Sequence, residues 1–195
     1  MGCAQRVAGR VISRRDLCRA CRIVAAGCWR GRVPHANAGG ARVRLPLLRG
    51  CRRLRTPTRD PPFLVKPNGE EASRFLRRQV ATPEDACDAA KAFHQRGVAV
   101  AIVSIGAAGA AMVSSEGAFF AKPPNVETVS TIGSGDSLVG AFLAALEEGR
   151  THEEALRLGV AAGAATATTG GAEIGRCGTI LSLVDQVDIK RLEQD

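Results

Sequence analysis

The chain has 195 residues, 45% of them hydrophobic, and a mean hydropathy of −0.01, which is typical of a soluble globular protein. No stretch of about 18 residues is apolar enough to span a bilayer, which excludes a membrane-spanning protein. The charge is uneven: residues 1–60 hold 15 arginines, no lysine and two acids, about +13, whereas residues 61–195 carry about −5. The net charge of +8 therefore belongs to the first segment and does not indicate that the folded part binds nucleic acid.

Residues 1–60 show no sustained helical or alternating periodicity, and we expect poor order there. Their one CxxC pair, Cys18 and Cys21, has no second pair or histidine pair at zinc-ligand spacing, so no metal site is predicted. The segment has three interpretations: an organellar transit peptide, a basic arm for nucleic acid or membrane surfaces, or a stretch that never evolved to fold, such as one from a misplaced start or a shifted reading frame. The last is favoured.

From residue 61 onward, the chain alternates strand and helix patterns. Strands are predicted at 63–68, at 98–106 and in a hairpin over 109–124 that turns at 115–117. Helices are predicted at 69–80, 82–97, 133–149, 151–171 and 179–190. Thr82 and Thr151 stand at N-cap positions, and Glu154 follows Thr151 at capping-box spacing. The alternation predicts an α/β fold with a sheet covered by helices.

The stretch STIGSGDSLVGAFLAAL, residues 130–146, carries the strongest chemical signal. A helix N-terminus presents unpaired N–H groups and partial positive charge, and Gly133 and Gly135 let the backbone approach a ligand closely. Asp136, in the first turn, is placed to accept a proton from an attacking hydroxyl, so the pattern favours phosphoryl transfer. The alternative is that Asp136 only caps a helix and the glycines only make a turn. No Walker A loop is present, because no GK[ST] follows.

Two further segments end predicted strands with residues suited to ligands. SIGAAG (104–109) is a glycine-rich turn after a buried strand, and KPN (66–68) adds a cation and an amide. Ligands of open α/β sheets bind at the carboxyl ends of strands. These segments therefore support a ligand site built from several strand ends.

Together, the motifs VSTIGSGDSLVGAFLAAL, LVKPNGEE and VSIGAAGA resemble those of the ribokinase-like (PfkB) carbohydrate kinases in order and spacing. The resemblance covers residues 61–195 and is strongest to the phosphofructokinase branch, above all the minor ATP-dependent 6-phosphofructokinases of bacteria. It implies the C-terminal part of a three-layer α/β/α sandwich, a cytoplasmic location, and ATP-dependent phosphorylation of a sugar phosphate. Fructose 6-phosphate is the first choice of acceptor, with fructose 1-phosphate and tagatose 6-phosphate as alternatives. The implied cofactors are ATP and Mg²⁺, with K⁺ as the monovalent cation that such kinases often bind; no membrane or nucleic-acid partner is implied.

The resemblance also implies roles for single residues. Asp136 would be the catalytic base, and Gly133, Ser134 and Gly135 would form the anion hole. Glu71 would organise Mg²⁺ through water. The nucleotide would be bordered by Lys66, Asn68, Ser104, Gly106, Gly109, Val160 and Ala164. A monovalent cation would lie near Ser130, Ile132, Thr166, Thr169 and Gly171. Three residues depart from the family pattern: Ser134 replaces the usual Ala, Thr169 an Asn of close relatives, and Glu173 an Arg.

The N-terminal half of a complete family member supplies the first strands, the sugar-binding residues and a lid that often forms a dimer. None of these features is recognisable in residues 1–60. We therefore expect residues 61–195 to be a nucleotide-binding C-terminal half behind an unrelated leader. Such a chain would turn over weakly or not at all, because the sugar would not be oriented, and its dimerisation is doubtful. The alternatives are a non-catalytic ATP-binding fragment and, less favoured, a basic nucleic-acid-binding protein acting through residues 1–60.

Overall fold

The computed structural model describes residues 5–7, 10–12, 30–32, 42–44, 61–171 and 173–193. The described residues divide into two compact units: one includes residues 123–171 and 173–188, and the other includes residues 61–122 and 189–193. The first 60 residues contribute four described strands, paired antiparallel as β1 with β2 and β3 with β4: Gln5–Val7, Arg10–Ile12, Arg30–Arg32 and Arg42–Arg44. The other residues of this segment, for which the sequence predicts poor order, lie outside the described residues. So do Cys18 and Cys21, the CxxC pair.

A five-stranded mixed sheet organises the second unit, in the order β5-β6-β7-β8-β9. Its strands are Leu64–Val65, Val100–Ser104, Ala110–Ser114, Gly117–Lys122 and Asp188–Leu192. β5 and β6 are parallel, whereas β6, β7 and β8 are antiparallel. Ser114 pairs with Gly117, so the predicted hairpin turn is confirmed.

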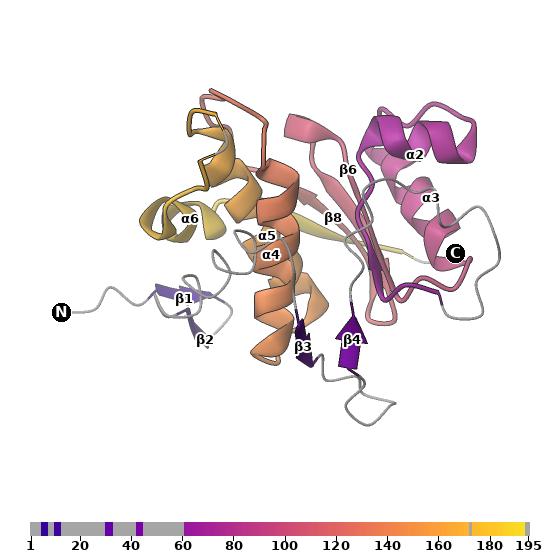
Figure 1. Cartoon of the computed structure of the whole chain (residues 1–195), viewed down its shortest axis with the longest axis horizontal. Helices are drawn as coiled ribbons and strands as arrows, with labels where there is room; N and C mark the ends of the chain where they lie inside the picture. Colours follow the sequence, from indigo (N-terminus) through magenta and orange to yellow (C-terminus); the bar gives the residue numbers. More distant parts are fainter. Residues whose placement is uncertain are drawn as a thin grey trace. The chain divides into compact units, whose positions relative to one another are not determined.

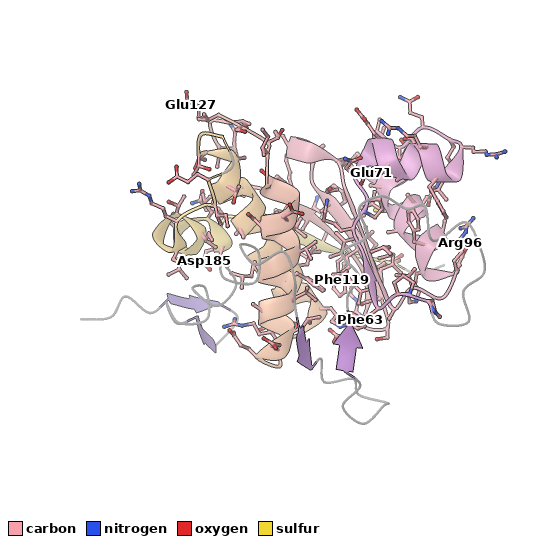
Figure 2. The ribbon with its side chains drawn as sticks, viewed as in Figure 1. Phe63, Glu71, Arg96, Phe119, Glu127 and Asp185 are labelled. Atoms are coloured by element: carbon pink, nitrogen blue, oxygen red, sulfur yellow. The ribbon has the colours of Figure 1, made fainter. Side chains whose placement is uncertain are left out.

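Helices α2, Gly69–Leu76, and α3, Pro83–His94, connect β5 to β6 and lie beside the sheet (Figure 1). The apolar side of α3 packs on the sheet, and the shared core includes Phe93, Ala86, Ala89, Ala90, Val103, Ala111 and Val113. The rings of Phe75 and Phe93 stack with centroids 5.0 Å apart, and the Arg96 guanidinium, labelled in Figure 2, lies over the Phe75 ring. This core fixes the carboxyl ends of β5 and β6.

The predicted start of α3 is confirmed. The N–H of Asp85 donates to the Thr82 hydroxyl at 3.1 Å, and the N–H of Thr82 donates to the Asp85 carboxylate at 3.0 Å. The N–H groups of Thr82 and Ala81 hold the pKa of the Asp85 carboxyl below its usual value. Pro83 opens the helix, where its missing N–H has no consequence.

Three helices dominate the other unit: α4 Ser134–Glu147, α5 His152–Ala167 and α6 Cys177–Val184. α4 and α5 approach closely at two glycines of α5. A Cβ at Gly159 would lie 2.8 Å from the Leu138 carbonyl oxygen, and a Cβ at Gly163 would lie 3.1 Å from the Ser134 carbonyl oxygen. The predicted capping box at Thr151 is confirmed. No helix in the described part of the chain is long and apolar enough to cross a membrane.

The predicted last helix, 179–190, is wrong in its second half. α6 ends at Val184, and Asp188–Leu192 is strand β9 of the sheet. The Arg191 guanidinium donates to the Glu116 carbonyl oxygen at 3.1 Å and lies over the Phe119 ring. Contacts with the distant β7–β8 hairpin therefore override the local helical preference.

Candidate active site

The N-terminus of α4 differs from those of α2, α3 and α5. Each of those three begins with a reciprocal capping box, whereas no side chain caps α4. Its N-cap is Gly133, whose φ of 80° is in the left-handed region that glycine adopts readily. Because a helix leaves its first N–H groups without partners inside the helix, this end offers amide donors and a partial positive charge of about +0.5.

Asp136 is exposed in the first turn of α4. Its carboxylate does not cap the helix. This geometry weighs against the alternative in which Asp136 serves only as a cap. An exposed carboxylate beside uncapped amides is free to take a proton from a ligand bound there.

Ser134 begins α4, and its hydroxyl oxygen is buried with no hydrogen-bond partner among the described residues. A buried hydroxyl without a partner costs about 1–3 kcal/mol. We therefore expect Ser134→Ala to stabilise the chain by about 1 kcal/mol, as measured by urea unfolding at constant m-value. A loss of stability would instead show that the hydroxyl has a partner.

The residues predicted for a monovalent cation gather around the end of α5. The Ser130 hydroxyl donates to the Gly171 carbonyl oxygen at 3.2 Å and accepts the Ile132 N–H at 3.2 Å. The Thr169 hydroxyl lies 2.8 Å from the Thr166 carbonyl oxygen, which also accepts the Thr169 N–H at 3.0 Å. Four of the five positions thus lie in hydrogen-bonded loops, and the oxygens of Thr166 already have partners.

Val160 and Ala164, the residues predicted to border the adenine, both lie on α5. Both are buried, and they alternate with the two glycines that approach α4. The predicted site residues of this unit are therefore carried by one helix pair and the loops at its end.

In the sheet unit, the carboxyl ends of β5 and β6 bring together Lys66, Asn68 and Ser104. The Lys66 ammonium donates to the Ser104 hydroxyl at 3.2 Å. The backbones of Asn68 and Ser104 form an isolated parallel bridge, and the Ser104 N–H donates to the Pro67 carbonyl oxygen at 3.1 Å. The two motifs that the sequence places 38 residues apart are thus neighbours at one sheet edge.

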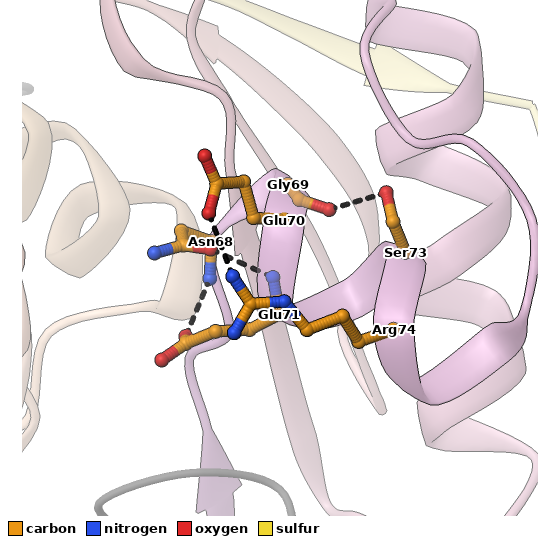
Figure 3. A network of polar contacts seen from close by, with 6 residues as sticks. All are labelled: Asn68, Gly69, Glu70, Glu71, Ser73 and Arg74. Carbon is orange, nitrogen blue, oxygen red and sulfur yellow. Dashed lines mark hydrogen bonds and ion pairs between the residues drawn. The ribbon is translucent and has the colours of Figure 1, made fainter.

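Asn68 and Glu71 form the capping box of α2 (Figure 3). The Glu71 N–H donates to the Asn68 side-chain oxygen at 2.8 Å, and the Asn68 N–H donates to the Glu71 carboxylate at 3.0 Å. Only one carboxylate oxygen of Glu71 takes part in this box. The N-x-x-E pattern therefore caps α2. The second carboxylate oxygen of Glu71 can still bind another ligand.

The glycine-rich turn after β6 is tight. The Ile105 N–H donates to the Gly109 carbonyl oxygen at 2.8 Å across an exposed 3₁₀ turn, Gly106–Ala108. Gly106 and Gly109 have φ of 62° and 133°. Both values are in the region that favours glycine, which explains the glycine pair of the motif.

One group was missed by sequence reasoning: Ser137, Thr166 and Gly175 are joined by buried hydrogen bonds. The only sequence signal was a serine on an otherwise apolar side of α4. No cluster of three or more histidine, cysteine or acidic side chains that could hold a metal occurs among the described residues.

The model of the pfkB family carbohydrate kinases matches residues 43–176. The chain therefore belongs to the pfkB family of carbohydrate kinases. The match begins before residue 61, where the sequence predicted the domain boundary. The expected family is confirmed.

Two curated relatives come from Escherichia coli strain K12. The chain is 35% identical to 1-phosphofructokinase over 129 residues, which cover 66% of this chain and 41% of the relative. It is 41% identical to ATP-dependent 6-phosphofructokinase isozyme 2 over 112 residues, 57% of this chain and 36% of the relative. The chain thus spans about two fifths of the length of the first of these relatives.

Solved structures agree with the fold. Phosphofructokinase-2 from Escherichia coli, in complex with potassium, matches with a TM-score of 0.59 and 35% identity over 64% of this chain and 41% of that one. Arabidopsis thaliana ribokinase, complexed with ribose and ATP, matches with a TM-score of 0.56 and 29% identity over 63% of this chain and 41% of that one. The ribokinase-like α/β class predicted from the sequence is confirmed.

Proposed function

We propose that this chain supplies the nucleotide-binding and phosphoryl-transfer part of a sugar-phosphate kinase. An acceptor hydroxyl attacks the γ-phosphorus of ATP, Asp136 takes the hydroxyl proton, the bond to the bridging oxygen breaks, and ADP leaves. The observation that carries the proposal is the exposed Asp136 carboxylate on an uncapped, glycine-flanked helix end. A well-placed base contributes about 10²–10⁴-fold to such a rate.

The N–H groups of Gly133 and Gly135 would hold the negative charge of the group in transfer, because they are fixed donors at the positive end of α4. The Ser134 N–H, the third predicted donor, fits less well because it donates to the Thr131 carbonyl oxygen at 3.3 Å. In the sheet unit, Lys66, Asn68, Ser104, Gly106 and Gly109 would bind the nucleotide. Val160 and Ala164 would border its adenine. These assignments rest on the family's motifs, and the Lys66–Ser104 contact supports the pairing of two of them.

Magnesium would be held mostly by the phosphates of ATP, as is usual for this ion, with Glu71 contributing through water. The Glu71 carboxylate oxygen that takes no part in the capping box is suited to that role. When bound, the ion neutralises phosphate charge. Potassium is proposed near Ser130, Ile132, Thr169 and Gly171, and the potassium complex of a similar structure supports it. Thr166 fits less well, because its carbonyl and hydroxyl oxygens already accept hydrogen bonds.

Fructose 6-phosphate is the proposed acceptor, with fructose 1-phosphate and tagatose 6-phosphate as alternatives. The names of the two curated relatives support a fructose phosphate. Turnover by this chain is expected to be weak, since it spans only part of those relatives and acceptor orientation is a large part of catalysis. The cytoplasm, where ATP and sugar phosphates are available, is the proposed location.

The test is a coupled assay of ADP release with each of the three sugar phosphates, together with calorimetric titration of ATP in the presence of Mg²⁺. Turnover with one acceptor supports the kinase and identifies its substrate. ATP binding without turnover favours the alternative of a non-catalytic ATP-binding protein. Absence of ATP binding overturns the proposal. The nucleic-acid alternative rests on the fifteen arginines of residues 1–60, nine of which lie outside the described residues.

Glu71→Gln separates the two tasks of Glu71. Glutamine can still accept the Asn68 N–H, so stability should stay within about 0.5 kcal/mol of the original. The charge that favours Mg²⁺ is lost, so ATP affinity should fall several-fold with Mg²⁺ and stay unchanged without it. Glu154→Gln in the equivalent box of α5 is the control and should change neither. An unchanged Mg²⁺ dependence for Glu71→Gln would exclude the metal role.

A further inference from the structure

A buried polar network ties the first turn of α4 to two other segments. The Thr166 hydroxyl donates to the Ser137 hydroxyl oxygen at 2.8 Å and accepts the Gly175 N–H at 3.0 Å. Thr166 and Ser137 are 1% and 2% exposed. Water therefore does not replace these bonds, and each group depends on the others for its partner.

Gly175 shows how tightly the third segment is held. A Cβ there would lie 2.7 Å from the backbone of Ala165 and Thr166. The chain before α6 thus rests directly on the last turn of α5, where no larger residue fits. The Gly175 N–H reaches the Thr166 hydroxyl only because of this approach.

The loop that enters α4 is attached to the same end of α5. The N–H groups of Val129 and Ser130 both donate to the Ala167 carbonyl oxygen, at 2.8 and 3.2 Å. The segment that carries Gly133 to Asp136 is therefore fixed on both sides, by Ala167 before the helix and by Thr166 within its first turn. Neither attachment uses the amides that point out of the helix end.

We infer that Thr166 is a positioning residue, which sets the first turn of α4, and with it Asp136 and the anion-binding amides, at the end of α5. The inference rests on the proposed function. It assigns Thr166 a task other than the cation position that the resemblance implies. Ser137, next to Asp136 in the chain, transmits the constraint.

Thr166→Val tests the inference, because it keeps the shape and removes the hydroxyl. Thr166→Ser should restore the network. Thr168→Val is the matched control, since that hydroxyl donates only to the nearby Ala165 carbonyl oxygen at 2.8 Å. The readouts are amide hydrogen exchange at Ser137, whose N–H donates to the Gly133 carbonyl oxygen at 2.9 Å, and binding of MgADP with and without fluoroaluminate, which mimics the group in transfer.

For Thr166→Val we expect faster exchange of the Ser137 amide and an affinity for the fluoroaluminate complex reduced about tenfold or more, because small displacements are costly at such sites. Binding of MgADP alone should change less than twofold. Thr166→Ser and Thr168→Val should behave like the original chain. If Thr166→Val does not fold, Ser137→Ala takes its place in the same measurements.

Equal exchange and equal fluoroaluminate affinity in Thr166→Val and Thr168→Val would overturn the inference. A different result would reject the proposed function: if the unmodified chain binds neither MgADP nor its fluoroaluminate complex, the kinase role fails, and with it the catalytic meaning of the network. The two failures are thus distinguished by the behaviour of the unmodified chain.

Discussion

Replacing Asp136 with Asn is expected to remove phosphoryl transfer and to strengthen ATP binding. Without the carboxylate, no base takes the hydroxyl proton, and turnover should fall by about 10²–10⁴-fold. At the same time, a negative charge leaves the helix end that receives phosphate, so repulsion decreases and ATP affinity should rise several-fold. Sugar-phosphate-dependent ADP release and calorimetry measure the two effects separately.

The binding half of this prediction holds even for a chain with very low turnover. Asp185→Asn is a suitable control, because Asp185 is an exposed carboxylate at the other end of a helix, after α6. It should change neither ADP release nor affinity. If Asp136→Asn left ATP affinity unchanged, Asp136 would have to lie away from the bound phosphates, and the proposed mechanism would be wrong.

Gly109→Ala is expected to have the largest effect on stability. The φ of 133° is strained for alanine, and the new Cβ would lie 2.6 Å from the Ala121 carbonyl oxygen and 2.7 Å from the Phe120 ring. Backbone strain and overpacking together should cost about 3 kcal/mol or more. Urea unfolding, with the m-value compared between variants, measures the loss.

Gly106→Ala is the matched control within the same turn. Its φ of 62° is also left-handed, but no atom lies within 4 Å of the new Cβ. Strain alone should cost about 1–2 kcal/mol. Equal losses for the two variants would show that the close contact at Gly109 is relieved by a small shift of β8, in which case the glycine there serves ligand approach and not packing.

The elements predicted correctly are those whose signals are local. The N-cap at Thr82 and the capping box at Thr151 depend on residues at most three positions apart, and the β7–β8 turn spans two residues. β9 was missed because its partner strand lies more than 60 residues earlier, and a short segment with mixed charges has no local feature that separates strand from helix.

The candidate site follows the same division. The glycines and Asp136 are predicted as site residues from a short motif of adjacent residues, and that assignment stays a prediction. The bonds from Thr166 to Ser137 and to Gly175 join positions 29 and 9 residues apart, so only the packed structure reveals them. The orphan hydroxyl of Ser134 was likewise invisible, because burial of one atom depends on how α5 packs over it.

The backbone contacts at Gly159 and Gly163 have a mechanical consequence. With no side chains between them at these points, α4 and α5 cannot slide past each other without a collision of main-chain atoms. Val160 and Ala164 follow those glycines in the sequence. The residues proposed to border the adenine and the carboxylate proposed as the base therefore lie on one rigid helix pair, α4 and α5. The distance from a nucleotide bound at Val160 and Ala164 to the Asp136 carboxylate would therefore stay nearly constant during thermal motion.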